Sequence, residues 1–123
     1  MHSEDEEILN QRKKLREKGN VLTHPIWRNE ESAISSTRRI VKIALRLNKK
    51  AHILHVTTKE EVDFLSQNKG NITFEITPQH LTLTSPECYE KLGTFAQMNP
   101  PIRDKSHYDR LWYAVRNLSL IHI

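Results

Sequence analysis

Residues 51–57, AHILHVT, are the stretch that most constrains the fold of this chain. They form a short apolar run, followed at once by Thr58 and two glutamates, which is a helix-start signal. An apolar run of this length with helical patterns on both sides predicts a buried parallel strand. Side chains alternate along a strand, so we expect His52 to face the covering helices and His55 to face the other way. His55 lies at the carboxyl end, where α/β folds place their chemistry, and is either a metal ligand or a hydrogen-bonded buried histidine.

Helix and strand patterns alternate along the rest of the chain. Ser3 is expected to cap the first helix with Glu6 completing a capping box, and Asn29 is expected to cap the second. Residues 72–77 alternate between apolar and polar side chains, as a half-buried strand does. Strands alternating with helices predict parallel βα units, although a closed (β/α)₈ barrel needs about 250 residues. The predicted elements are helices at 4–18, 29–48, 58–68, 85–93 and 104–116, strands at 51–57, 72–77 and from 118 onward, and loops at 20–28 and 94–103.

Size and composition favour one small domain, 1–123, in a reducing compartment. The net charge is +4, with acids interspersed among the bases, and the one cysteine, Cys88, excludes an intramolecular disulfide and is expected to be buried. No apolar stretch approaches the roughly 18 residues that span a membrane, and the acidic start is not a signal peptide. The basic runs at 12–14 and 38–39 raise the alternative of a nucleic-acid binder, but no recognised motif supports it. We therefore expect a soluble cytoplasmic protein that binds neither nucleic acid nor membrane.

Several longer motifs occur in order along the chain. They are His2-Ser3-Glu4-Asp5-Glu6, the segment 24–31 (HPIWRNEE), the segment 52–58 (HILHVTT), the segment 75–81 (EITPQHL) and the segment 97–103 (QMNPPIR). This series, covering residues 2 to about 117, resembles the dihydroorotases of the amidohydrolase superfamily. The resemblance implies an α/β fold that is a partial (β/α)₈ TIM barrel, corresponding roughly to the fifth to eighth βα units. It also implies a metal-dependent hydrolase that opens and closes the dihydroorotate ring in pyrimidine biosynthesis.

The same resemblance assigns roles to individual residues. It implies that His2 and His55 descend from metal ligands on the fifth and sixth strands, with zinc as the metal in the family. Asn99 matches a residue that contacts the substrate ring, and Arg103 belongs to the same motif. For His2 the alternative is a solvated histidine at a terminus, and for Asn99 and Arg103 it is a role in loop structure. Glu75 and the nearby His80 are remnants of a polar barrel interior or ordinary hydrogen-bonded residues.

The chain also departs from the family pattern. It has no H-x-H motif, nothing that corresponds to the fourth-strand ligand, and no aspartate motif after an eighth strand. The fifth strand is expected to be missing, because His2 follows Met1 directly. A catalytic divalent ion usually has at least three protein ligands. We therefore expect zinc to be absent or weakly bound, no catalytic residue to remain, and the chain by itself to lack dihydroorotase activity.

A second class of function is a non-catalytic interaction protein. Unpaired strands and an uncovered apolar face favour association. The expected partners are aspartate carbamoyltransferase, the remaining barrel fragments, or a second copy of this chain.

Overall fold

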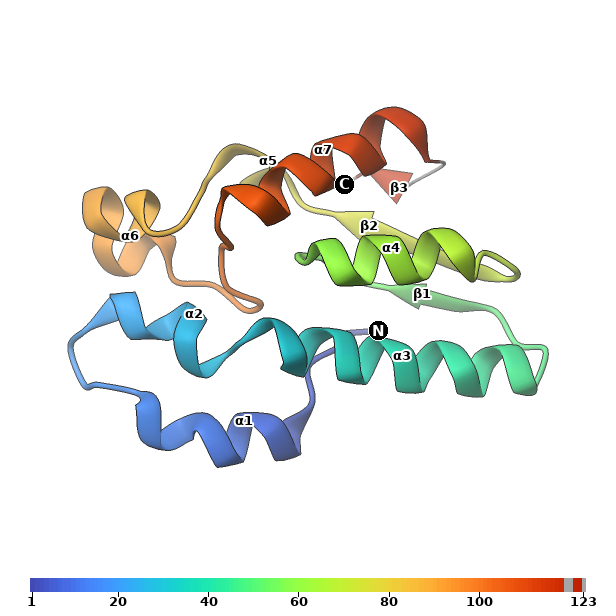
Figure 1. Cartoon of the computed structure of the whole chain (residues 1–123), viewed down its shortest axis with the longest axis horizontal. Coiled ribbons are helices and arrows are strands. Elements are labelled where there is room, and N and C mark those ends of the chain that lie inside the picture. Colours follow the sequence, from blue (N-terminus) through green and yellow to red (C-terminus); the bar gives the residue numbers. More distant parts are fainter. Residues whose placement is uncertain (119–120, 123) are drawn as a thin grey trace.

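Helices and short parallel strands alternate along the chain (Figure 1). The computed structural model describes residues 1–118 and 121–122. The elements are α1 Glu6–Arg12, η1 Lys13–Leu15, η2 Val21–Thr23, α2 His24–Trp27, α3 Glu30–Arg46, β1 Ala51–Ile53, α4 Lys59–Gln67, β2 Ile72–Ile76, α5 Pro78–Thr82, α6 Glu87–Leu92, η3 Gly93–Ala96, α7 Lys105–Asn117 and β3 Ile121–His122. No helix in this described part of the chain combines the length and the apolar character needed to cross a membrane.

In the described residues, the strands form one parallel sheet in the order β1-β2-β3. This confirms the expectation of parallel strands alternating with helices. The amino end of the chain also lies along the sheet. The Met1 amino group donates to the His52 carbonyl at 2.6 Å, and the Leu54 amide donates to the Met1 carbonyl at 3.2 Å. This is the bonding pattern of a parallel ladder, so Met1 occupies the place of a further strand beside β1.

Helices α3, α4 and α7 cover one face of the sheet (Figure 1). The apolar side chains of β2 enter this core together with Ile53 of β1, as the alternation over 72–77 predicts. A second, smaller cluster contains Cys88, which is buried as expected, and packs α6 against η2 and the loop around Ile102. The main core consists of Val41, Ala44, Ile53, Val56, Val62, Leu65, Ile72, Phe74, Ile76, Leu111 and Ala114.

The opposite face of the sheet carries polar side chains. His52 contacts the Thr73 hydroxyl through Nδ1 at 2.8 Å and the Glu75 carboxylate through Nε2 at 2.9 Å. The prediction that His52 faces the covering helices is therefore wrong. The helix-facing positions of β1 belong to Ala51 and Ile53, and the period of two sends His52 to the other side.

Other boundaries differ from the predictions for local reasons. Asp5, not Ser3, caps α1 by accepting the amides of Glu7 and Ile8, and the helix is shorter than predicted because its apolar stripe is thin. The predicted loop at 20–28 is largely helical, with a proline in the first turn of α2, where it is tolerated. Strand β1 ends at Ile53 instead of residue 57, because the chain turns out of the ladder at His55. The predicted strand at the end of the chain is confirmed at 121–122; residues 119, 120 and 123 lie outside the described residues.

A buried carboxylate, Glu61, joins the segment after β1 to α3 and to the amino end of the chain. It accepts hydrogen bonds from the Thr37 hydroxyl (2.7 Å), the Thr58 hydroxyl (3.0 Å), the Thr58 amide (3.2 Å) and the Thr57 amide (3.3 Å). The Thr37 hydroxyl in turn bonds the hydroxyl of Ser3 at 3.0 Å. Burial raises the pKa of Glu61, and these donors oppose that shift because they favour the charged form.

We predict that Glu61→Ala destabilises the fold by about 3–5 kcal/mol, because it leaves several buried donors without an acceptor. Glu61→Gln, which keeps one acceptor oxygen, is expected to lose less. Urea unfolding monitored by circular dichroism measures both. Glu90→Ala, at an exposed position of α6, is the matched control and is expected to change the free energy of unfolding by less than about 0.5 kcal/mol. Equal effects of the Glu61 and Glu90 substitutions would contradict the prediction.

Candidate functional site

The two predicted ligands, His2 and His55, lie side by side at the carboxyl ends of the strands. His2 follows the residue that pairs with β1, and His55 lies just beyond the end of β1. His2 Nδ1 and His55 Nε2 are 2.8 Å apart, and the rings meet edge to face with centroids 4.7 Å apart. The fold thus brings together two histidines that are 53 positions apart in the sequence.

The backbone at His55 is in the left-handed region, with φ of 40°. This conformation ends the strand and frees His55 from the alternation that fixes His52. Burial lowers the pKa of the His55 imidazole, and the neighbouring His2 lowers it further. The ring is therefore held in the neutral form, which is the form that binds metals. Its Nδ1 is buried and has no hydrogen-bond partner among the described residues.

Two residues that the sequence did not single out complete the surroundings of His2. Glu4 Oε2 lies 3.3 Å from His2 Nε2, and its side chain is almost fully buried. Arg28 binds both carboxylate oxygens of Glu4, with Nε 3.2 Å from Oε1 and Nη2 in contact with Oε2. Glu4 stands two positions after His2, and in an extended segment that spacing puts two side chains on one face. The spacing of two between His2 and Glu4 was therefore the sequence signal that could have identified Glu4.

Arg103 and Asn99, the predicted substrate-binding residues, occupy different environments. Arg103 is 4% exposed and donates to the Arg28 carbonyl at 2.6 Å, while its Nε lies 3.4 Å from the Thr57 hydroxyl. Burial lowers the pKa of its guanidinium, and the nearby carboxylates oppose that shift. Asn99 is exposed on the loop before it. Arg103 thus reaches the site indirectly, by fixing the backbone of the residue that holds Glu4.

Glu75 and His80 are not bonded to one another. Glu75 binds His52, whereas His80 lies 2.7 Å from the Thr77 hydroxyl through Nδ1 and 3.1 Å from the Pro100 carbonyl through Nε2. A carbonyl only accepts, so Nε2 carries the proton and Nδ1 accepts from Thr77. Burial lowers the pKa of His80 to about 4, so the ring is neutral at pH 7.

The donors around His2 and His55 fit part of a metal centre. Zinc binds histidine nitrogen at about 2.0–2.1 Å, and catalytic sites use three protein ligands. His2 and His55 supply two converging nitrogens, but the Glu4 carboxylate is committed to Arg28. Within the described residues, no group of three or more histidine, cysteine, aspartate or glutamate side chains could hold a metal ion. The residues present therefore do not complete a catalytic metal site.

The arrangement of strands and helices matches solved hydantoinases. The L-hydantoinase (dihydropyrimidinase) from Arthrobacter aurescens superimposes with a TM-score of 0.87 over 94% of this chain, which is 27% of that protein, at 20% sequence identity. A D-hydantoinase superimposes with a TM-score of 0.83 over 97% of this chain and 29% of its own, at 27% identity. With these neighbours, the fold defines part of an amidohydrolase-superfamily protein.

Sequence comparison identifies the family within that class. The dihydroorotase of Pyrococcus abyssi is 36% identical over 89 residues, which cover 72% of this chain and 22% of the relative. The dihydroorotase of Halobacterium salinarum is 30% identical over 112 residues, covering 91% of this chain and 25% of the relative. No family model matches the chain. By sequence the chain is a homologue of the dihydroorotase family, and it spans about a quarter or less of the length of these relatives.

We predict that neutral His80 makes stability depend on pH. Its folded pKa of about 4 lies below the usual 6.5, so the unfolded chain binds the proton more readily. The contribution is fully present above pH 6.5 and is lost as pH falls toward 4, by about 3 kcal/mol in all. Urea unfolding measures the free energy of unfolding at pH 7.5 and at pH 4. The loss between these two pH values should be smaller in His80→Gln, whose amide can still bond Thr77 and Pro100, than in the unsubstituted chain. Parallel pH profiles for the two proteins would contradict this.

Proposed function

We propose that the chain is a segment of a dihydroorotase-type (β/α)₈ barrel, roughly its fifth to eighth βα units, that does not hydrolyse dihydroorotate by itself. The observation that carries the proposal is the convergence of His2 and His55 at the carboxyl ends of parallel strands. Barrel enzymes of this architecture keep their active sites at that end. The proposed setting is pyrimidine biosynthesis in the cytoplasm, and the proposed substrate class is a cyclic amide.

The chemistry of such a hydrolysis explains why the segment is proposed to be inactive alone. Opening a cyclic amide needs an activated hydroxide, a polarised carbonyl and a group that moves the proton. A bound zinc ion would supply the first two, and His2 and His55 are the residues that would hold it. The Glu4 carboxylate forms an ion pair with Arg28, and the donors of Arg103 are directed at backbone carbonyls and the Thr57 hydroxyl. The described residues leave no free carboxylate beside the two histidines to act as the base.

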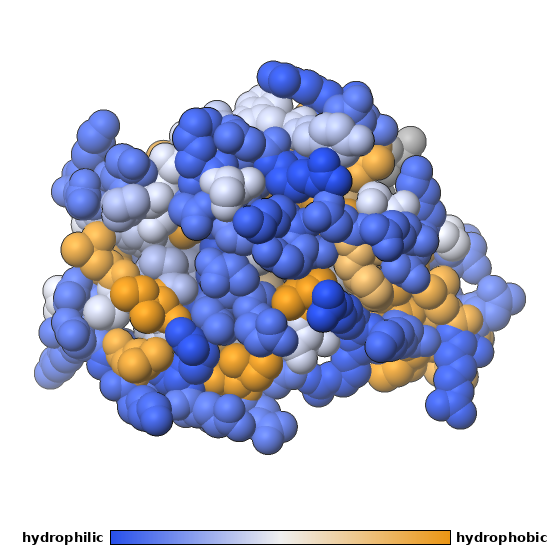
Figure 2. Space-filling view, in the orientation of Figure 1, coloured by the Kyte–Doolittle hydropathy of each residue, from blue (hydrophilic) through white to orange (hydrophobic). Residues whose placement is uncertain are grey.

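A second proposed function is that of a non-catalytic partner. It is supported at the end of α3, where Ile43 is 53% exposed and the following cap residue, Leu47, is 59% exposed. Figure 2 shows apolar side chains gathered near the carboxyl end of this helix. Exposed apolar side chains at the end of a helix favour a polypeptide that packs against them. The proposed partners are the remaining barrel fragments, with aspartate carbamoyltransferase as the alternative.

We predict no turnover of dihydroorotate by the purified chain after zinc loading, because two histidines orient a metal ion poorly and, in the described part of the chain, no free carboxylate stands beside them to act as a base. Ring opening is measured by chromatography, with a dihydroorotase as positive control and zinc content determined by elemental analysis. Turnover that disappears in His55→Gln but persists in His24→Gln would overturn the proposal. His24 is the matched control, because it is a buried histidine whose ring bonds Met98 and Gln97 and neither His2 nor His55.

We predict that the chain associates with a polypeptide that supplies the preceding barrel units. Size-exclusion chromatography of the two together is expected to give a complex. The double substitution Ile43→Ser and Leu47→Ser is expected to weaken the affinity at least tenfold, which corresponds to a loss of about 1.4 kcal/mol of binding free energy. Leu92→Ser, an exposed apolar residue of α6, is the control that should have no effect. A chain that stays monomeric with both the barrel fragment and aspartate carbamoyltransferase rules this function out.

A further inference from the structure

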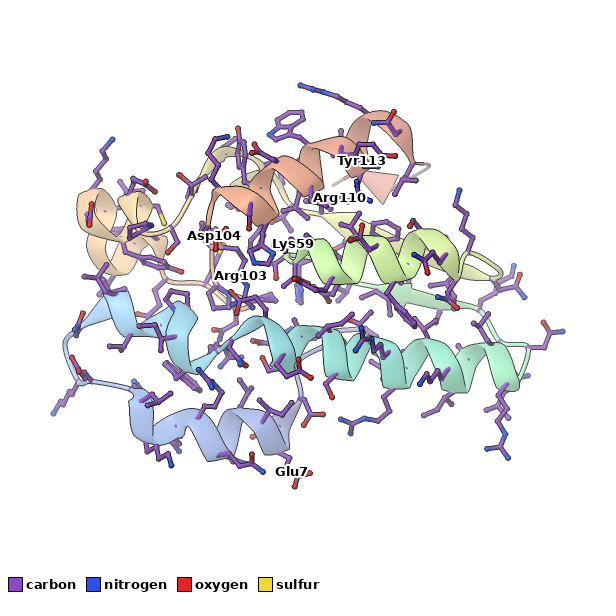
Figure 3. All side chains as sticks on the ribbon, in the orientation of Figure 1. Glu7, Lys59, Arg103, Asp104, Arg110 and Tyr113 are labelled. Atoms are coloured by element: carbon purple, nitrogen blue, oxygen red, sulfur yellow. The ribbon has the colours of Figure 1, made fainter. Side chains whose placement is uncertain are left out.

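A buried histidine lies where three helices begin, apart from the His2–His55 pair. His107, in the first turn of α7, is 4% exposed and lies against the first turns of α3 and α4. Figure 3 shows Lys59, Arg103 and Asp104 close together at this junction. The backbone amides of a first helical turn have no partner within the helix. The side chains around this junction therefore decide how those amides are satisfied.

The imidazole of His107 satisfies one of them. The Lys59 amide, at the start of α4, donates to His107 Nδ1 at 3.0 Å. An acceptor nitrogen carries no proton, so the proton of the neutral ring is on Nε2. Nε2 faces Glu30 Oε1 of α3 at 3.8 Å. His107 thus acts as a second cap of α4, beside Thr58, whose hydroxyl accepts the amide of Glu61.

A proton taken up from solvent at Nδ1 would remove this acceptor. The ring N–H and the Lys59 N–H would then point at each other, and two donors repel. An alternative acceptor is already in place, because Glu60 Oε2 lies 3.6 Å from His107 Nδ1. This oxygen is buried and has no hydrogen-bond partner among the described residues. A small movement of the ring would exchange the Lys59 amide for the Glu60 carboxylate.

We propose that His107 is a two-position cap: neutral, it accepts from the Lys59 amide; protonated, it releases that amide and donates to Glu60 and Glu30. The charged groups that face it are Glu30 from α3, Glu60 and the exposed Lys59 from α4, and Asp104 and Arg103 from the segment that begins α7. Protonation then ties the first turns of α3 and α4 together through the ring and frees the first amide of α4. The Lys59 amide lies four positions after His55 in the sequence, so the freed turn adjoins the segment that carries this histidine.

The direction of the pH dependence follows from the surroundings. Burial lowers the pKa of His107 and is the largest effect. The carboxylates of Glu60, Asp104 and Glu30 raise the pKa of His107, and the Arg103 guanidinium lowers it. The switch therefore operates below pH 6.5. The capped form predominates at neutral pH, and the charged form grows as the solution is acidified.

Nuclear magnetic resonance of the full chain between pH 8 and pH 5 tests the proposal. At pH 8 the proton of His107 is expected on Nε2. As the ring titrates, the Lys59 amide resonance should shift with the same midpoint, and its protection factor against hydrogen exchange should fall by about tenfold. The Glu61 amide, held by Thr58, should keep its protection. A proton on Nδ1 at pH 8, or a Lys59 amide that changes only when the whole chain unfolds, would overturn the proposal.

Three variants make the test specific. Glu60→Gln removes the charged acceptor and should move the midpoint of the Lys59 shift to lower pH. His107→Gln offers a carbonyl oxygen to the Lys59 amide and should abolish the titration. His24→Gln removes a buried histidine elsewhere and should leave the titration unchanged. A midpoint unaffected by Glu60→Gln overturns the proposal even where His107→Gln fails to fold.

Discussion

The buried Glu61 carboxylate is the interaction on which the arrangement of the site depends. Taking a carboxylate out of water costs several kcal/mol unless donors replace the water, and here four donors do so. Two of its partners, Thr57 and Thr58, follow His55 in the chain, and the third, Thr37, binds Ser3, which follows His2. The same carboxylate therefore fixes the chain next to both histidines. Together with the backbone bonds between Met1 and β1, a residue that touches neither histidine thus holds the segments that carry them.

Charged residues continue this support outward from the pair. Arg103 holds the carbonyl of Arg28, the guanidinium of Arg28 holds Glu4, and Glu4 faces the ring of His2. The series stabilises the position of His2, but it also occupies the nearest carboxylate. Within the described residues the two histidines are held firmly, and no group of three metal-binding side chains forms around them.

The sequence predicted the parts of the fold that local patterns determine. Asn29 and Thr58 cap their helices as predicted, and β2 turns its apolar side chains toward the helices. Its failures concern contacts across the chain. The side of the sheet that His52 faces depends on whether the helices cover the side of β1 that carries Ala51 and Ile53 or the opposite side. Whether Ser3 or Asp5 caps α1 depends on Thr37, which takes the Ser3 hydroxyl.

The candidate site divides in the same way. The pairing of His2 with His55 came from the order of family motifs, because no spacing rule relates residues on neighbouring strands. The spacing of two indicates that Glu4 shares a face with His2, but its ion pair with Arg28 spans 24 positions, which no periodicity reveals. For Arg103 the motif left open a substrate contact or a role in loop structure, and in this fold its guanidinium donates to the backbone carbonyls of Arg28 and Asn29.

The left-handed backbone at His55 separates the demands of folding from those of chemistry. A residue with a side chain gives up about 1–2 kcal/mol in this conformation, whereas glycine adopts it freely. A turn here would be made more readily by glycine, and histidine brings to it an imidazole whose Nδ1 has no hydrogen-bond partner among the described residues. Position 55 is thus a place where backbone preference and side-chain chemistry oppose each other. The fold alone does not require an imidazole at this turn, and the one found there contacts His2.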